Sequence, residues 1–497
     1  MKEHWTVYNP LGLLILRSLT GYNTPSIWEN VMQFPTVAFT LFFLSFLLLW
    51  WALPRQTAAR TWVLIAGSLV FYAASGLQWV GVLLAVSVVA WGGSRWIASS
   101  SRPKVAGWVT VGALVANLVV WKYSQWAVSL RNDWAETFHW AVWQLPEWAL
   151  PVGLSFFTFH ALAIVLAVWN KGMVPYSFSK VLAQISFFPA LLAGPVLKED
   201  AVAGPLDKPF VWSQVKWVTA VGMIMLGMTF KWVLSTQAAG VSDPVFQGLA
   251  NSVVEVWWGV HAYGAQIFFD FAGYSLMAIG VAMLLGFVLP PNFTQPYLAT
   301  SAKEFWGSWH RSLSFFFRDH LYIQVFGGNR NGKMVGLLAA ASTMLVSGLW
   351  HGASLTFVVW GAWHAAWLVG ERLIPHRDAW PKWLGWIVSV EIAMWGWVWF
   401  RAENWDAALD VFAQGWGLAA LPFGALPSVA IVLWSLIGVA VVFAERSVLR
   451  GFDWLETRLD QQAHWTQWPA VAVAGGWAWV IMLWGPVGVP PFIYNGF

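Results

Sequence analysis

Two histidines in residues 301–352 are candidates for proton-transfer chemistry. His351 ends an apolar run, Met334–Trp350, and is followed directly by Gly352, while His310 lies earlier among charged residues. An ionisable side chain in an apolar segment is costly to keep inside a membrane, so it marks a candidate functional site. Histidine suits such a place because its imidazole can be neutral near pH 7 and still accept a proton. The pattern predicts a proton-transfer role for His351.

Each of these residues also has a structural interpretation. His351 could bond a carbonyl between helices, and His310 could lie at the membrane interface beside tryptophans. Asp270 stands in a phenylalanine-rich run, and we expect it to bond a neighbouring helix rather than to act as a base. We expect His320 and His364 to pack or to lie at the interface. No pair of histidines has the spacing of metal ligands, so we expect no metal site.

The composition describes the protein that must position these residues. Of the 497 residues, 59% are hydrophobic and only 10% are charged, whereas a soluble domain carries about 25% charged residues. The 42 tryptophans suit the membrane interfaces of many helices. The excess of basic over acidic residues, 27 against 23, is too small to indicate nucleic acid, and without cysteine there is no disulfide or thiolate nucleophile. We therefore predict an all-α, polytopic integral membrane protein.

Apolar runs predict about eleven to thirteen membrane segments, because a spanning helix needs roughly 20 residues. Several runs are shorter, so we expect broken or re-entrant helices among them. The run Val253–Leu289 is long enough for two passes, and Ser124–Trp148 is expected to lie at the interface. The other expected segments are Pro35–Trp51, Thr61–Ser75, Leu77–Gly93, Val105–Trp121, Leu150–Trp169, Val181–Val196, Val215–Leu234, Ser354–Val369, Trp383–Trp399, Leu426–Phe443 and Val471–Trp484. No soluble domain, linker or repeat is visible, so we expect one membrane domain over residues 1–497.

Basic residues orient these segments, since loops rich in arginine and lysine stay in the cytoplasm. The loops at residues 55–60 and 95–104 are basic, which places the N-terminus outside. Basic residues at 446–458 precede the last segment and place the C-terminus outside as well. Lys122 and Arg131 fall on the outer side in this scheme, against the rule. No cleavable signal peptide is recognised, and the first apolar run is expected to remain as an anchor.

Six sequence blocks occur in an order that indicates a family. They are LPVGLSFFTFHAL (Leu150–Leu162), FFPALLAGPVLK (Phe187–Lys198), FFDFAGYSLMAIGVAMLLGFVLPPNFTQPY (Phe268–Tyr297), EFWGSWHRSLSFFFRDHLYI (Glu304–Ile323), GGNRNG (Gly327–Gly332) and GLWHGASLTFVVWG (Gly348–Gly361). Together they resemble the membrane-bound O-acyltransferase (MBOAT) family, and within it the bacterial polysaccharide O-acetyltransferases of the alginate branch. The likeness covers a core at residues 150–365. The N-terminal helices in 1–149 and the C-terminal helices in 375–485 contribute only hydropathy.

The resemblance implies catalytic roles for both histidines. His351, in Leu-Trp-His-Gly, matches the catalytic histidine of the family, and His310, in Trp-His-Arg-Ser, matches a second polar position that is His or Asn. Both are expected in a tunnel open to the two sides of the membrane. A thioester is already activated, so acyl transfer needs a base for the attacking hydroxyl and hydrogen-bond donors for the carbonyl oxygen.

The last six residues, Phe492–Phe497, resemble the Phe-x-Tyr-x-x-Phe ending of the same branch. By that resemblance Tyr494 is an acyl relay, and the alternative is an aromatic anchor at the membrane surface.

No residue is assigned to binding of the acyl donor. Four basic residues of the central stretch either follow the positive-inside rule or bind the phosphates of a coenzyme-linked donor: Arg311, Arg318, Arg330 and Lys333.

We therefore predict an O-acyltransferase of a bacterial cytoplasmic (inner) membrane. It is expected to take an acetyl group from a cytoplasmic thioester, acetyl-CoA, without a permanently bound cofactor, for O-acetylation of an extracytoplasmic polysaccharide such as alginate or cellulose. Expected partners are an extracytoplasmic esterase-like (SGNH) acetyltransferase, polysaccharide synthase machinery and membrane lipid, and not nucleic acid. Two alternatives stay open. One is D-alanyl or other acyl transfer to a cell-wall polymer, and the other is a membrane transporter, which would also use broken helices and buried polar groups.

Overall fold

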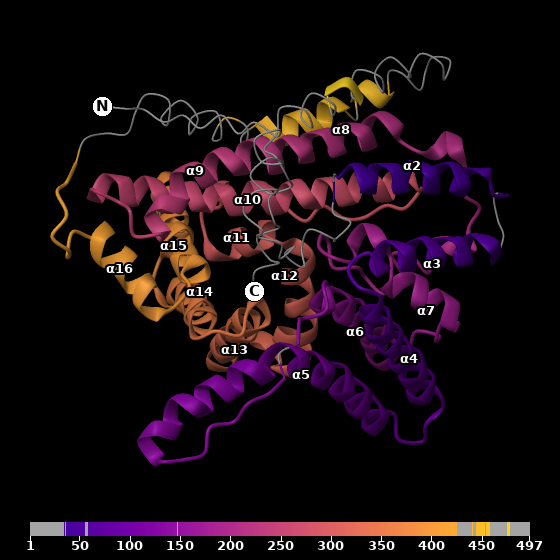
Figure 1. Cartoon of the computed structure of the whole chain (residues 1–497), viewed down its shortest axis with the longest axis horizontal. Coiled ribbons are helices and arrows are strands. Elements are labelled where there is room, and N and C mark those ends of the chain that lie inside the picture. The colour runs from indigo at the N-terminus through magenta and orange to yellow at the C-terminus, as the bar shows by residue number, and fades with distance from the viewer. Residues whose placement is uncertain are drawn as a thin grey trace, which may run out of the picture.

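The computed structural model describes Phe34 and residues 36–54, 58–146, 148–424, 440, 444–452, 454–457 and 475–477. Over these residues it is built from helices without a β-strand, which confirms the all-α prediction (Figure 1). The longer helices are α2 (Val37–Ala52), α3 (Ala58–Ala73), α4 (Leu77–Ser99), α5 (Pro103–Phe138), α6 (Leu154–Lys171), α8 (Trp217–Met228), α9 (Ser235–Phe246), α10 (Val253–Leu284), α13 (Lys333–His351), α14 (Leu355–Leu373), α15 (Lys382–Arg401) and α16 (Trp405–Gly415). Short helices lie between them: α7 (Phe178–Ile185), α11 (Ala302–Ser308), α12 (Arg311–Phe317) and the π-helices η5 (Thr229–Leu234) and η7 (Arg318–Val325).

Seven helical runs in the described part are long and apolar enough to cross a membrane. They are α4, α5 to Ala135, α6, the continuous run from α8 through η5 to α9, α10, α13 and α15. The chain is therefore a multi-pass membrane protein, as predicted. The two expected segments nearest the C-terminus, Leu426–Phe443 and Val471–Trp484, fall almost wholly outside the described residues. The total of about eleven to thirteen segments stays a prediction.

Helix α10 corrects the prediction of two passes within Val253–Leu289. It is one helix of 32 residues, which at about 1.5 Å per residue is about 48 Å long and must tilt in a hydrocarbon core of about 30 Å. Its glycines allow close backbone approach instead of a turn. A Cβ on Gly273 would lie 2.6 Å from the carbonyl oxygen of Gly227. Helices α8 and α9 therefore run alongside α10, in the close packing that small residues permit between membrane helices (Figure 1).

Two further expectations were wrong. The predicted break between a span ending at Trp121 and an interfacial piece from Ser124 does not occur, because α5 continues unbroken to Phe138. The residues between are Lys122 and Tyr123, and neither stops a helix as glycine or proline would. The predicted segment Val181–Val196 is not a span, since α7 ends at Ile185 and buried turns follow. Irregular backbone of this kind is tolerated at membrane depth where protein covers it.

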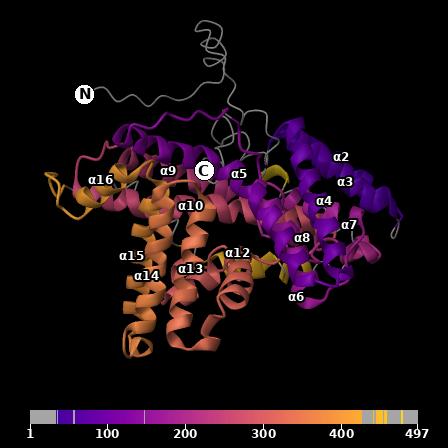
Figure 2. The ribbon, with the colours of Figure 1, turned by 90° about the horizontal axis from the view of Figure 1, so that it is seen from below.

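A hairpin of two helices, α13 and α14, places His351 at its bend. The two helices touch through glycines: a Cβ on Gly348 would lie 2.3 Å from the carbonyl oxygen of Phe357 and 3.0 Å from Cα of Gly361. Ser354 starts α14 as its N-cap and accepts a hydrogen bond from the backbone N–H of Thr356. Figure 2 shows α13, α14 and α15 side by side, running across the direction of α10. The bend of the hairpin lies against α15, because His351 contacts Phe400 there.

Candidate active site

His351 is the last residue of α13 and its side chain is buried in aromatic rings. Its imidazole makes edge contacts with Trp360 of α14, with ring centres 4.8 Å apart, and with Phe400 of α15 at 5.2 Å. The side chain is 5% exposed. The next residue must be small, because a Cβ on Gly352 would lie 2.0 Å from the ring of Phe357. The Trp-His-Gly sequence therefore fits a tight end of α13 packed against α14.

His310 lies between α11 and α12 in a left-handed backbone conformation, with φ of 40°. Helix α11 begins at the N-cap Ser301, and His310 itself precedes α12. A non-glycine residue with positive φ is uncommon and costs energy, so tertiary contacts must hold it. Two such contacts are an edge contact with Phe271 of α10, with ring centres 4.6 Å apart, and a hydrogen bond to Asn292. The side chain is 1% exposed.

Asn292 fixes the tautomer of His310. Its Oδ1 lies 3.1 Å from Nδ1 of His310, and it also accepts from the backbone N–H of Ser312 at 3.3 Å and from the Ser312 hydroxyl at 2.8 Å. Its Nδ2 donates to the hydroxyl of Ser275 at 3.1 Å. Because the backbone N–H can only donate, this oxygen assignment is fixed, and His310 must donate from Nδ1. In the neutral ring Nε2 is then the accepting nitrogen, and it has no hydrogen-bond partner among the described residues.

The indole of Trp350 joins the two histidines. Its ring centre lies 4.8 Å from that of His351 and 6.2 Å from that of His310. The structure thus brings together the two histidines that the sequence singled out, although about forty residues separate them in the chain. Two buried imidazoles in one apolar setting can take a proton from a hydroxyl and return it to a leaving group.

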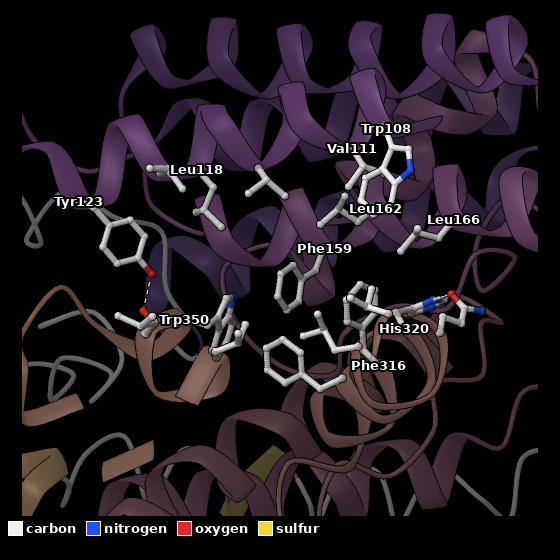
Figure 3. Close-up of a pocket in the computed structure, with 18 of the residues that line it drawn as sticks. Trp108, Val111, Leu118, Tyr123, Phe159, Leu162, Leu166, Phe316, His320 and Trp350 are labelled. Atoms are coloured by element: carbon white, nitrogen blue, oxygen red, sulfur yellow. Dashed lines mark hydrogen bonds between the residues drawn. The ribbon is translucent and has the colours of Figure 1, made fainter. Parts of the chain in front are cut away.

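A cavity of about 770 Å³ is lined in part by Trp350 (Figure 3). It lies between α5, α6, α13 and the segment α12–η7, and apolar side chains form most of its wall, including Trp108, Leu162, Phe159 and Phe316. Polar side chains gather at one end, where Gln324 Oε1 accepts from Asn170 at 2.8 Å and lies 3.1 Å from Nδ1 of His320. Neither site histidine lines this cavity, so Trp350 is the residue that the cavity and the histidine pair share.

The remaining ionisable candidates have structural partners. Asp270 forms an ion pair with Lys231 of η5, and both side chains are almost fully buried. This confirms the expectation that Asp270 bonds a neighbouring helix. His364 packs among tryptophans, with ring centres 4.8 Å from Trp360 and 5.0 Å from Trp306, which confirms a packing role. His320, by contrast, lines the cavity.

Two of the four basic residues of the central stretch meet at one aromatic ring. Arg318 pairs with Asp319 at 2.7 Å, and both Arg318 and Arg311 lie over the ring of Phe315. Arg330, in the short helix before α13, and Lys333, the first residue of α13, are exposed. Tyr494 lies outside the described residues.

Sequence reasoning missed Asn292, although this residue stands inside the quoted Phe268–Tyr297 block. The signal available was a polar residue directly after two prolines in an apolar run.

Comparison with known proteins places these residues in a family. Residues 93–400 match the model of the membrane-bound O-acyltransferase family, MBOAT. The chain is 35% identical over 427 residues to the probable alginate O-acetylase of Azotobacter vinelandii, covering 82% of this chain and 84% of that protein. It is 34% identical over 362 residues to the probable alginate O-acetylase of Pseudomonas aeruginosa, covering 71% and 69%. It is 28% identical over 349 residues to the peptidoglycan O-acetyltransferase of Helicobacter pylori, covering 63% and 65%.

Proposed function

The chain belongs to the membrane-bound O-acyltransferase family and is an O-acyltransferase, and from this premise we propose that it supplies acetyl groups for O-acetylation of an extracytoplasmic polysaccharide. The relatives that support the proposal are alginate O-acetylases and a peptidoglycan O-acetyltransferase. All three act on polymers of the cell exterior by their names. Membership of an enzyme family sets aside the transporter alternative.

The observation that carries the chemistry is the buried pair His351 and His310, whose rings both lie near the indole of Trp350. In our proposal His351 is the general base. It takes the proton of an attacking hydroxyl, whose oxygen forms a bond to the acyl carbon of the thioester. The carbon–sulfur bond then breaks, and the proton passes to the leaving thiolate, so that a thiol and an oxygen ester result. No metal or redox step is needed for this balance.

His310 has the second role in the proposal. Asn292 holds its Nδ1 proton, so Nε2 is the nitrogen that can accept a further proton. In the proposal this nitrogen receives the one proton that His351 takes from the hydroxyl and delivers it to the leaving sulfur. The burial of both rings excludes water, which would otherwise hydrolyse the thioester.

We further propose acetyl-CoA as the donor, reaching the site from the cytoplasm of a bacterial inner membrane. The support is the distribution of basic residues, from which the positive-inside rule predicts that both chain termini lie on the outer side. Tyr494 is the proposed first acceptor, and its acetyl ester would pass to an extracytoplasmic esterase-like acetyltransferase that works with a polysaccharide synthase. Asn170, His320 and Gln324 at the cavity's polar end are not assigned to the donor.

Membrane vesicles of opposite orientation test the direction of transfer. Acetyl-CoA carrying a labelled acetyl group does not cross a bilayer, so it reaches only the outward face of a vesicle. We expect inverted vesicles, which expose the cytoplasmic face, to transfer label to protein and polymer, and right-side-out vesicles to transfer none until they are permeabilised. Vesicles that carry His351→Ala give the background. Equal labelling of intact vesicles in both orientations would contradict the cytoplasmic donor, and labelling in neither would contradict acetyl transfer from this donor.

A further inference from the structure

The end of α13 leaves carbonyl groups that the helix itself cannot satisfy. In any α-helix the last four carbonyls have no intrahelical donor, and here they belong to Gly348, Leu349, Trp350 and His351. Gly352 continues in an extended conformation, so the chain does not curl back to cap them. At membrane depth an unpaired carbonyl costs several kcal/mol. The residue that our proposed mechanism depends on, His351, therefore lies where a helix would fray first.

Two consecutive residues of α5 supply the missing donors. Nζ of Lys122 donates to the carbonyl oxygen of Trp350 and, at 2.9 Å, to that of His351. The hydroxyl of Tyr123 donates to the carbonyl oxygen of Leu349, and Figure 3 shows this bond as a dashed line beside Trp350. Three successive carbonyls at the end of α13 are thus held by one short piece of another helix.

The residue types suit this task physically. The carbonyl end of a helix carries partial negative charge, which favours a lysine there. The Lys122 nitrogen also lies 5.9 Å from the centre of the Trp350 ring, so the same side chain lies near the indole that neighbours both histidines. The interaction explains why Lys122 departs from the positive-inside rule: its amino group is engaged inside the protein. Helix α5 is otherwise largely exposed, and this contact ties it to the site.

We propose that Lys122 and Tyr123 are positioning residues that hold the His351 imidazole in its working place by capping α13. The inference rests on the proposed role of His351. The new element is that α5 holds the general base in position, although α5 lies outside the six sequence blocks described above. A displacement of about 1 Å at a reacting group can cost about 10²-fold in rate, so release of this cap should be visible in turnover rather than in donor binding.

The test uses the full-length protein in detergent or nanodiscs, with acetyl-CoA as donor and turnover counted per folded molecule. Lys122→Met keeps the stem but removes the donors, and we expect kcat to fall by about 10- to 100-fold while KM for acetyl-CoA changes by less than about threefold. Lys122→Arg can still donate to two carbonyls and is expected to recover most of kcat. Tyr123→Phe removes one hydroxyl and should lower kcat by about three- to tenfold. Lys104→Met is the matched control, because Lys104 is an exposed lysine near the start of the same helix.

The outcomes separate this inference from the proposed function. If His351→Ala is inactive but Lys122→Met and Tyr123→Phe turn over normally, the capping inference is wrong and the role of His351 stands. If His351→Ala remains active, the proposed function fails first. A loss that appears equally in Lys104→Met, or that Lys122→Arg does not relieve, would also overturn the positioning role. Where Lys122→Met does not fold, the Tyr123→Phe result decides.

Discussion

His310 donates its Nδ1 proton to Oδ1 of Asn292 across 3.1 Å, and this single bond sets which nitrogen of the imidazole faces the site. The same oxygen accepts two bonds from Ser312, so the asparagine is itself held in one orientation. The arrangement resembles the general pattern in which a third group orients a catalytic imidazole. It also explains how a histidine with positive φ is kept in place.

The first prediction concerns this bond. Asn292→Ala removes the acceptor for His310, and we expect acyl transfer to fall by at least about tenfold because the imidazole can rotate. The loss of buried hydrogen bonds should also lower stability by about 1–3 kcal/mol. Ser275→Ala is the control, since it removes a partner of Asn292 that does not touch His310. Turnover and the thermal midpoint of the purified protein measure the two effects. Equal turnover in both variants would show that Asn292 does not orient the histidine.

The second prediction compares two substitutions at position 310. His310→Asn keeps a polar side chain that can hydrogen-bond to Asn292, whereas His310→Ala does not. We expect the asparagine variant to retain more transfer than the alanine variant and clearly more than His351→Ala. The measurement is initial rate at saturating acetyl-CoA. If His310→Asn were as inactive as His351→Ala, the roles assigned to the two histidines would have to be exchanged.

The third prediction concerns the buried ion pair of Lys231 and Asp270. Asp270→Asn removes the carboxylate that pairs with the buried ammonium of Lys231, and breaking a buried pair costs about 3–5 kcal/mol. The double variant Lys231→Met with Asp270→Leu removes both charges and should recover most of that stability. Because we assign the pair to structure, the double variant should also keep most of its turnover per folded molecule. A folded double variant without activity would make Asp270 or Lys231 part of the chemistry.

The fourth prediction concerns Tyr494. Tyr494→Phe keeps the aromatic ring for membrane anchoring but removes the hydroxyl, which is the only nucleophilic atom. A relay predicts normal insertion, no acetylation of polymer, and no labelled C-terminal peptide after incubation with labelled acetyl-CoA. In the wild-type protein that label should be lost in alkaline hydroxylamine, as expected of an ester. Full polymer acetylation by Tyr494→Phe would leave this residue as an anchor.

Sequence patterns predicted the class of fold well but placed individual helices less well. Hydropathy cannot tell one long tilted helix from two short passes, so α10 was divided in two. The features that decide the matter are glycines such as Gly273 and Gly280, which pack against another backbone instead of making a turn. Polar residues inside a helix, such as Lys122, similarly suggested a break in α5 that does not exist.

The sequence predicts the two histidines of the candidate site but not the residues that hold them. A lone histidine at the end of an apolar run is visible from sequence and indicates His351, while the Trp-His-Arg-Ser block indicates His310 by resemblance. Their partners are set by tertiary structure: Asn292 comes from the loop after α10, and Lys122 from a helix more than two hundred residues before His351. The position of Asn292 after two prolines marks it as unusual but does not name its partner, and only the folded chain shows that these side chains meet the histidines.

The most direct test of the account is a single-turnover measurement on wild-type protein and His351→Ala. Both are incubated with labelled acetyl-CoA in nanodiscs, and formation of acetyl ester and free thiol is followed in time. His261→Asn serves as a control, because it removes a histidine of α10 whose ring lies 3.2 Å from Glu391 and which is not part of the proposed site. The account predicts a loss of at least about 10²-fold in His351→Ala with normal folding, and little change in His261→Asn. Near-normal ester formation by folded His351→Ala would contradict it.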